Sequence, residues 1–171
     1  ALALQFGHRL SEDLDFFTPE SFDKELVKAE LMDIGNWHTD SENKIGLRGK
    51  LNGVKMDFVT YRYPLLQPFT VIDEVRMLAQ ADISAMKLSA ITNRGAKKDF
   101  YDVYFLVQQH GFAQICDWYQ QKFETNNLLM LLKSVTYFDD AETSQTPIVL
   151  TEKVSWELVK QTMLDEVNNY V

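Results

Sequence analysis

The sequence predicts an α+β fold, in which a small mixed or antiparallel sheet with flanking helices is followed by a lobe of helices. Two segments, 44–50 and 54–61, have the composition of strands, and Asn52-Gly53 between them is a strong hairpin signal. Beyond residue 78, apolar residues recur at helical spacing. We therefore expect two domains, residues 1–78 and residues 79–171.

The remaining elements follow from local signals along the chain. A first helix ends at Gly7, and Leu14 to Phe17 alternate as in a short strand. Thr18-Pro19 is typical of a helix start and predicts a helix to about Met32. Asp82 is the expected N-cap of the next long helix. The other expected elements are short strands at 36–39 and 75–78, helices at 83–93, 98–110, 113–123 and 127–138, an acidic loop at 139–147, and a last helix within 153–171.

Composition excludes several classes of protein. The 171 residues are 46% hydrophobic with 7 Gly and 4 Pro, which excludes collagen-like and disordered chains. Charges interrupt every apolar run well before the roughly 18 residues of a membrane span. A single cysteine, Cys116, cannot form an internal disulfide, and no leader peptide is visible, so we expect a cytoplasmic protein. A net charge of -8 argues against bulk neutralisation of nucleic-acid phosphates, so any nucleic acid must be bound locally.

The segment from Ser11 to Phe17 is the most informative one. Residues two apart on a strand point the same way, so Asp13 and Asp15 project side by side. Two adjacent carboxylates repel each other unless a cation joins them, and carboxylate oxygens are ligands that Mg²⁺ takes together with phosphate. The alternation therefore suits a metal-phosphate site, although a solvated strand end would look the same.

A third acid, Asp57, lies among apolar residues of a predicted strand, where an acid is unexpected. Three acids on neighbouring strands would hold two divalent ions for an in-line displacement at phosphorus. A solvent-facing residue on an edge strand is the plain alternative for Asp57.

Two segments resemble the AbiEii/AbiGii toxin family of nucleotidyltransferases. They are residues 1–17 (ALALQFGHRLSEDLDFF) and residues 82–106 (DISAMKLSAITNRGAKKDFYDVYFL). The resemblance implies a polymerase-beta-like nucleotidyltransferase core. It also implies Asp13 and Asp15 as metal ligands, Ser11 near the nucleotide phosphates, Lys87 as the nucleotide-binding lysine and Asp99 as a later essential acid.

The same resemblance implies partners and cofactors. Members act as toxins of bacterial toxin-antitoxin or phage-defence systems, and some transfer nucleotides to RNA acceptors such as tRNA 3′ ends. We therefore expect a nucleoside triphosphate substrate, Mg²⁺ or Mn²⁺ as cofactor, a tRNA or protein acceptor, and a cognate antitoxin. Arg9 suits phosphate through its forked donors. The third metal ligand is Asp57 on strand geometry or Asp99 on the family motif.

The second segment can also be interpreted without the family. Lys87 and Arg94 are two helical turns apart, and Asp99 and Asp102 are three residues apart, so each pair shares a helix face. An ion pair between Arg94 and Asp102 that joins two helices is as good an explanation as catalysis for those two residues.

One departure from the family concerns the start of the sequence. Members normally carry Gly-Gly-Thr or Gly-Gly-Ser just before the segment at which this sequence begins, and we expect such a loop to precede Ala1. If it is absent, the rival hypothesis is a catalytically degenerate interaction module. A kinase-like phosphotransferase that uses the same acids is the other alternative.

Overall fold

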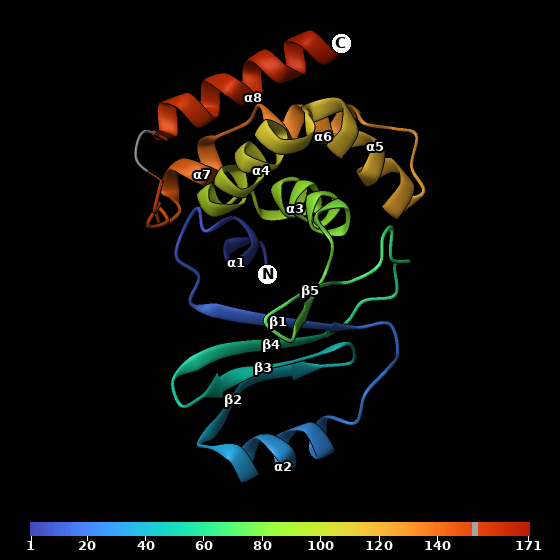
Figure 1. The fold of residues 1–171 in the computed structure, drawn as a ribbon, viewed down its shortest axis with the longest axis vertical. Coiled ribbons are helices and arrows are strands. Elements are labelled where there is room, and N and C mark those ends of the chain that lie inside the picture. The colour runs from blue at the N-terminus through green and yellow to red at the C-terminus, as the bar shows by residue number, and fades with distance from the viewer. Residues whose placement is uncertain (152–153) are drawn as a thin grey trace. The chain divides into compact units, whose positions relative to one another are not determined.

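The computed structural model describes residues 1–151 and 154–171, and it confirms the α+β class (Figure 1). Fourteen helices and strands follow one another within these ranges. In chain order they are α1 Leu2–Phe6, β1 Asp13–Thr18, α2 Lys24–Ile34, β2 Trp37–Asn43, β3 Gly46–Leu51, β4 Val54–Thr60, β5 Thr70–Ile72, β6 Val75–Met77, α3 Gln80–Arg94, α4 Lys97–His110, α5 Phe112–Phe123, α6 Leu129–Val135, α7 Asp139–Thr143 and α8 Trp156–Tyr170.

The chain forms two compact units. The sheet unit comprises residues 11–64 with Ala1, and the helical unit comprises residues 2–10 and 65–171. The sequence alone predicts two domains with a boundary after residue 78. The start of the chain belongs to the helical unit because the backbone of Leu10 donates to Ile148 at 3.0 Å and that of Leu150 donates to His8 at 2.8 Å.

The sheet unit contains a four-stranded mixed sheet with the order β1-β4-β3-β2. β1 runs parallel to β4, while the β2–β3 and β3–β4 pairs are antiparallel. Asn52 and Gly53 form the turn between β3 and β4 with φ of 51° and 86°, so both central residues are left-handed as a two-residue hairpin requires. The hairpin predicted from this dipeptide is therefore confirmed.

The predicted start of α2 is wrong. Thr18 ends β1, and the helix begins at Lys24 with Asp23 as its N-cap, whose side chain accepts from the backbone of Glu25 and Leu26. A side-chain cap that satisfies two exposed N–H groups outweighs the Pro signal five residues earlier.

One face of the sheet carries the core of the sheet unit. Leu47 and Trp37 are buried there together with Leu31 of α2, and Phe16 stacks on Phe58 with ring centroids 4.9 Å apart. The opposite face is therefore left for the polar residues of the alternating strands.

Gly49 of β3 makes room for Trp37. A Cβ added to Gly49 would overlap the ring of Trp37 and the carbonyl oxygen of His38. We expect Gly49→Ala to lower the free energy of unfolding by about 1–3 kcal/mol, because the neighbouring strand must shift to relieve the overlap. Urea denaturation measures this loss. Ser41→Ala, at an exposed position of β2, is the matched control and should change the stability by less than about 0.5 kcal/mol. Equal effects of the two substitutions would refute the packing argument.

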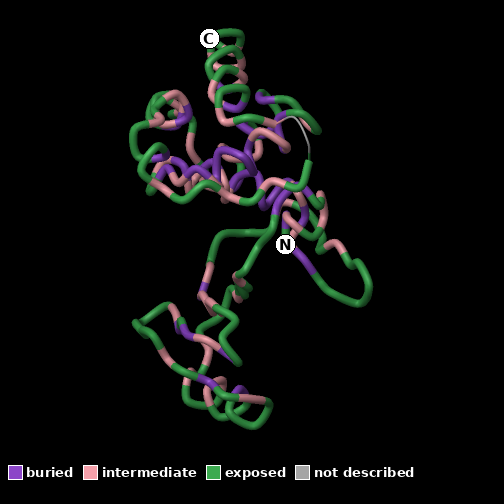
Figure 2. Tube along the Cα trace, turned by 90° about the vertical axis from the view of Figure 1, so that its left-hand side faces the viewer, coloured by how far each residue is buried: buried purple, intermediate pink, exposed green. Residues whose placement is uncertain are grey.

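The helical unit has the larger share of buried residues (Figure 2). Its core surrounds α3 and α4, where Leu88, Phe100, Val103 and Leu106 are fully buried. In the described part of the chain, no helix combines the length and apolar composition that crossing a membrane requires.

Several elements of the helical unit differ from those predicted. α3 begins at Gln80 rather than after Asp82, because Asp82 is buried inside the helix and its Oδ1 lies 2.6 Å from Nζ of Lys122. β5, which is three residues long, was not predicted from the sequence. Part of the expected acidic loop forms α7. The expected start of the last helix, Lys153, lies outside the described residues.

Candidate functional site

Two groups of polar residues are candidates, one in each unit. In the sheet unit, the register pairs Asp13 with Lys55 and Asp15 with Asp57. Because side chains alternate along a strand, these four residues share the face opposite the stacked phenylalanines. The strand pattern thus brings the three predicted carboxylates onto one face of two adjacent strands.

Asp57 is held by a neighbouring strand. Nε and one terminal nitrogen of Arg48 each donate to an oxygen of its carboxylate at 2.7 Å. Arg48 lies directly opposite Asp57 in the β3–β4 register, which explains this forked contact. Asp57 is predicted from the sequence, but its partner Arg48, nine residues earlier, is not.

Asp13 and Asp15 carry the kind of oxygen donors that a divalent cation takes. Mg²⁺ is commonly held by one or two protein carboxylates, with water and phosphate oxygens completing its shell. Within the described residues, no three His, Cys, Asp or Glu side chains converge as a ready metal site. The carboxylate oxygens of Asp13 and Asp15 are donors of the type that could hold a cation shared with a phosphate.

The helical unit contains a cluster of ionic groups around two fully buried carboxylates, here called the ion-pair cluster. Two carboxylates and four basic side chains form it: Asp99, Asp102, His8, Arg9, Lys87 and Arg94.

Asp102 lies at the centre of this cluster and is fully buried. Its Oδ1 accepts from Nε2 of His8 and from Nε of Arg9, each at 2.7 Å. Its Oδ2 accepts from a terminal nitrogen of Arg9 at 2.9 Å and lies 2.6 Å from Nζ of Lys87. Within the described residues, Nδ1 of His8 has no hydrogen-bond partner. Asp102 therefore fixes side chains from the first ten residues against α3 and α4.

Asp99 has its own set of donors. Arg94 contacts both of its oxygens, at 2.8 and 2.9 Å, and Nζ of Lys87 donates to it at 3.2 Å. The sequence analysis considered an Arg94–Asp102 pair, whereas these contacts join Arg94 to Asp99. Lys87 bridges the two carboxylates, so the two predicted residues Lys87 and Asp99 are in direct contact.

The electrostatics of the cluster favour an anion. Two carboxylates face three permanent cations, which leaves one net positive charge before His8 is counted. Burial opposes ionisation of Asp102, but hydrogen bonds from Arg9 and His8 and the charge of Lys87 outweigh it and hold its pKa well below the usual range. Burial likewise favours a neutral Lys87, but Asp102 and Asp99 outweigh it and raise the lysine's pKa.

Other predicted site residues are placed as follows. Ser11 is exposed in the segment before β1. The guanidinium of Arg9, predicted to contact phosphate, is 9% exposed and bound to Asp102. Sequence reasoning did not recognise the central place of Asp102 or the buried contact of His8. For Asp102, the only signal in the sequence was its three-residue spacing from Asp99. For His8, no local pattern indicated a buried contact.

Cys116 is not a candidate nucleophile. Its side chain is fully buried, and this burial, with a contribution from Asp117, raises the pKa of the thiol to about 12. We expect the folded protein to resist alkylation by iodoacetamide at pH 8 and the urea-unfolded protein to react readily, as measured by mass spectrometry. An exposed thiol introduced by Ser21→Cys is the matched control and should react in the folded state. Equal labelling of Cys116 with and without urea would contradict its burial.

Two solved structures share the fold of this chain. The chain is similar to JHP933 from Helicobacter pylori, with a TM-score of 0.52 and 15% identity over 98% of this chain and 79% of the other. It is also similar to a proposed nucleotidyltransferase from H. pylori, with a TM-score of 0.52 and 18% identity over 99% and 85% of the two chains. At these identities, the likeness concerns the fold alone.

Sequence comparisons identify a relative and a family. An uncharacterised protein of Aquifex aeolicus (strain VF5) is 32% identical over 177 positions, covering 100% of this chain and 84% of the relative. The family model described as nucleotidyl transferase AbiEii toxin of type IV toxin-antitoxin systems matches residues 45–169. This range includes Asp57, Lys87 and Asp99, and the resemblance identified from the sequence is confirmed. The chain belongs to the AbiEii family of nucleotidyl transferase toxins.

Proposed function

We propose that this protein transfers a nucleoside monophosphate from a nucleoside triphosphate to an RNA acceptor of the tRNA type. It would act as the toxin of a bacterial toxin-antitoxin or phage-defence system in the cytoplasm, with a cognate antitoxin as its protein partner. The observation that carries this proposal is the pair Asp13 and Asp15 on one face of β1, with Asp57 beside Asp15 in register.

The proposed metal site follows from this face. Asp13 and Asp15 would hold Mg²⁺ or Mn²⁺, with Asp57 or Asp99 as the proposed third ligand. Asp57 would have to exchange its contact with Arg48, and Asp99 its contacts with Arg94 and Lys87. When bound, the metal supplies positive charge to the phosphates and orients them.

The reaction is an in-line displacement at the α-phosphorus. An acceptor hydroxyl forms the new bond to phosphorus, and the bond to the oxygen bridging the β-phosphate breaks. Pyrophosphate leaves with the electron pair, and the hydroxyl proton passes to water. Such a transfer depends mainly on positioning and charge neutralisation, so few side chains are needed.

The basic side chains proposed to contact the nucleotide belong to the ion-pair cluster. Lys87 has three donors on its ammonium and is one-fifth exposed, so it can point a charge at a phosphate while it stays bound to Asp102. Arg9 and Ser11 are the other proposed phosphate contacts. The net positive charge of the cluster favours the triphosphate in a protein that is otherwise acidic.

The test is a product analysis. The protein, together with any residues that its gene encodes before Ala1, is incubated with Mg²⁺, bulk tRNA and each α-labelled nucleoside triphosphate. We expect label on RNA and an equal amount of pyrophosphate. A nucleoside diphosphate product would identify the kinase-like alternative. Neither product, together with no calorimetric binding of any triphosphate, would favour the interaction module.

A further inference from the structure

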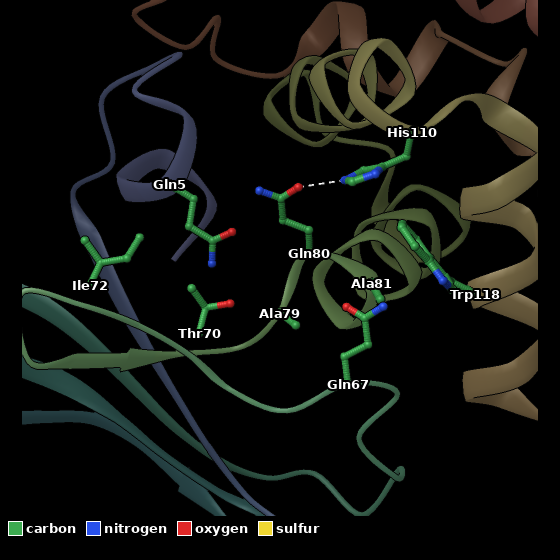
Figure 3. Close-up of a pocket in the computed structure, with 9 residues that line it drawn as sticks. All are labelled: Gln5, Gln67, Thr70, Ile72, Ala79, Gln80, Ala81, His110 and Trp118. Atoms are coloured by element: carbon green, nitrogen blue, oxygen red, sulfur yellow. Dashed lines mark hydrogen bonds between the residues drawn. The ribbon is translucent and has the colours of Figure 1, made fainter.

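A cavity in the helical unit lies outside the residues discussed so far. It has a volume of about 460 Å³, within the range of small-molecule sites. Its polar and aromatic lining comes from α1, the segment before β5, β5 itself, the start of α3, the end of α4 and α5 (Figure 3). The residues that matter here are Gln5, Gln67, Thr70, Gln80, His110 and Trp118.

Two of the glutamine amides have a fixed orientation. Gln80 accepts through its oxygen from Nε2 of His110 at 2.6 Å, which leaves its NH₂ group as a donor. Gln5 donates through Nε2 to the carbonyl of Leu78 at 2.9 Å, which leaves its oxygen as an acceptor. Within the described residues these remaining groups have no other partner. The cavity thus presents both a donor and an acceptor, the combination by which amide side chains recognise base edges.

Trp118 provides a flat apolar wall. The ring of His110 meets it at 71° with centroids 4.9 Å apart, so the imidazole holds the indole in place. Burial lowers the pKa of His110, which keeps this ring neutral at pH 7. Aromatic side chains at such positions are the usual stacking partners of unpaired bases.

None of the described residues that line the cavity is Lys, Arg, Asp or Glu. Asp82, at the start of α3, is neutralised by Lys122 at 2.6 Å and accepts from the backbone of Leu66 and Gln67, which holds Gln67 at the rim. A neutral cavity suits a planar hydrogen-bonding group rather than a phosphate or a charged peptide side chain.

The cavity lies on the same helix as the ion-pair cluster. Gln80 and Lys87 are seven residues apart on α3, which is two turns and about 10 Å along one face. Gln5 of α1 is three and four residues before His8 and Arg9 of the cluster. A chain with phosphates at the cluster can therefore reach the cavity with a base.

We propose that this cavity binds an unpaired nucleobase of the RNA acceptor, stacked on Trp118 and read by Gln5 and Gln80. The inference rests on the proposed nucleotidyl transfer and adds the means by which an acidic protein selects its acceptor.

The test is a binding measurement that needs no turnover. The sequence has three tryptophans, so the ¹H–¹⁵N spectrum should show three indole resonances. The resonance that disappears in Trp118→Phe belongs to Trp118. On titration with the single-stranded ribotrinucleotides of A, C, G and U, we expect at least one to shift the Trp118 resonance and leave those of Trp37 and Trp156 in place. Gln80→Leu should weaken this binding about tenfold or more, and Gln67→Ala, at an exposed position, should weaken it less.

Gln109→Leu, on the exposed side of α4, is the matched control and should bind as the parent does. The proposal is overturned if no trinucleotide moves the Trp118 resonance, or if Gln80→Leu binds as well as Gln109→Leu. It is also overturned if Mg²⁺-nucleoside triphosphate alone moves the resonance and displaces the trinucleotide, since the cavity would then hold the donor. If nucleotidyl transfer occurs but the Trp118 resonance does not shift, only the proposed base binding in the cavity is refuted. If the Trp118 resonance shifts but no nucleotide is transferred, only the proposed function is refuted.

Discussion

Replacing Asp15 by Asn is expected to lower the rate of nucleotidyl transfer by about a thousandfold or more. The amide keeps the shape of the side chain but removes one of the two charges proposed to hold the metal-bound triphosphate. Charge stabilisation by a metal contributes several kcal/mol to such transition states, and each 1.36 kcal/mol is a factor of ten, so a loss of about 4 kcal/mol corresponds to this effect. Pyrophosphate release under saturating triphosphate measures the rate.

The fold should survive this substitution because Asp15 is exposed on β1. Urea denaturation should give a free energy of unfolding within about 0.5 kcal/mol of the parent. Asp33→Asn, an exposed acid on α2 of the same unit, is the matched control for the change in charge and should retain full activity. If Asp15→Asn transfers nucleotides at the parental rate, Asp15 takes no part in the proposed reaction.

Replacing Asp102 by Asn is expected to cost about 3–5 kcal/mol of stability. The carboxylate is fully buried and contacts His8, Arg9 and Lys87. Removal of one partner from a buried ionic group leaves the other charges uncompensated, which is more costly than losing an exposed pair. Urea denaturation at pH 7 measures the loss. Asp117→Asn, at an exposed position on α5, is the control and should lie within about 0.5 kcal/mol of the parent.

The same carboxylate predicts a pH dependence of stability. Its folded-state pKa lies below its unfolded value of about 3.9, so Asp102 binds a proton more readily in the unfolded chain. Its contribution is fully present above that unfolded value and is lost as the pH falls toward the folded one. Between pH 6 and pH 3 we expect the parent to lose more stability than Asp102→Asn. Parallel curves for the two proteins would show that the cluster does not hold this carboxylate in its charged form.

Local signals predicted most of the fold. The Asn52-Gly53 dipeptide located the β3–β4 hairpin, and apolar spacing located α3, α4 and α5 to within three residues. Helix starts were less well predicted, because Pro19 and Asp82 are each consistent with a start that the tertiary structure does not use. Asp82 is needed as the buried partner of Lys122, forty residues later, and no local pattern contains that information.

For the candidate site, the sequence alone predicts which residues carry the proposed chemistry, and strand alternation predicts which of them share a face. Alternation along β1 places Asp13 beside Asp15, and the family motif names Lys87 and Asp99. The partners of these carboxylates are visible only in the folded protein: Arg48 for Asp57, Arg94 and Lys87 for Asp99, and His8 with Arg9 for Asp102. The difference comes from the distance along the chain over which each effect acts. Backbone periodicity acts over a few residues, whereas the pairing of buried charges depends on which segments pack together, and residues 8 and 102 meet only after the chain has folded.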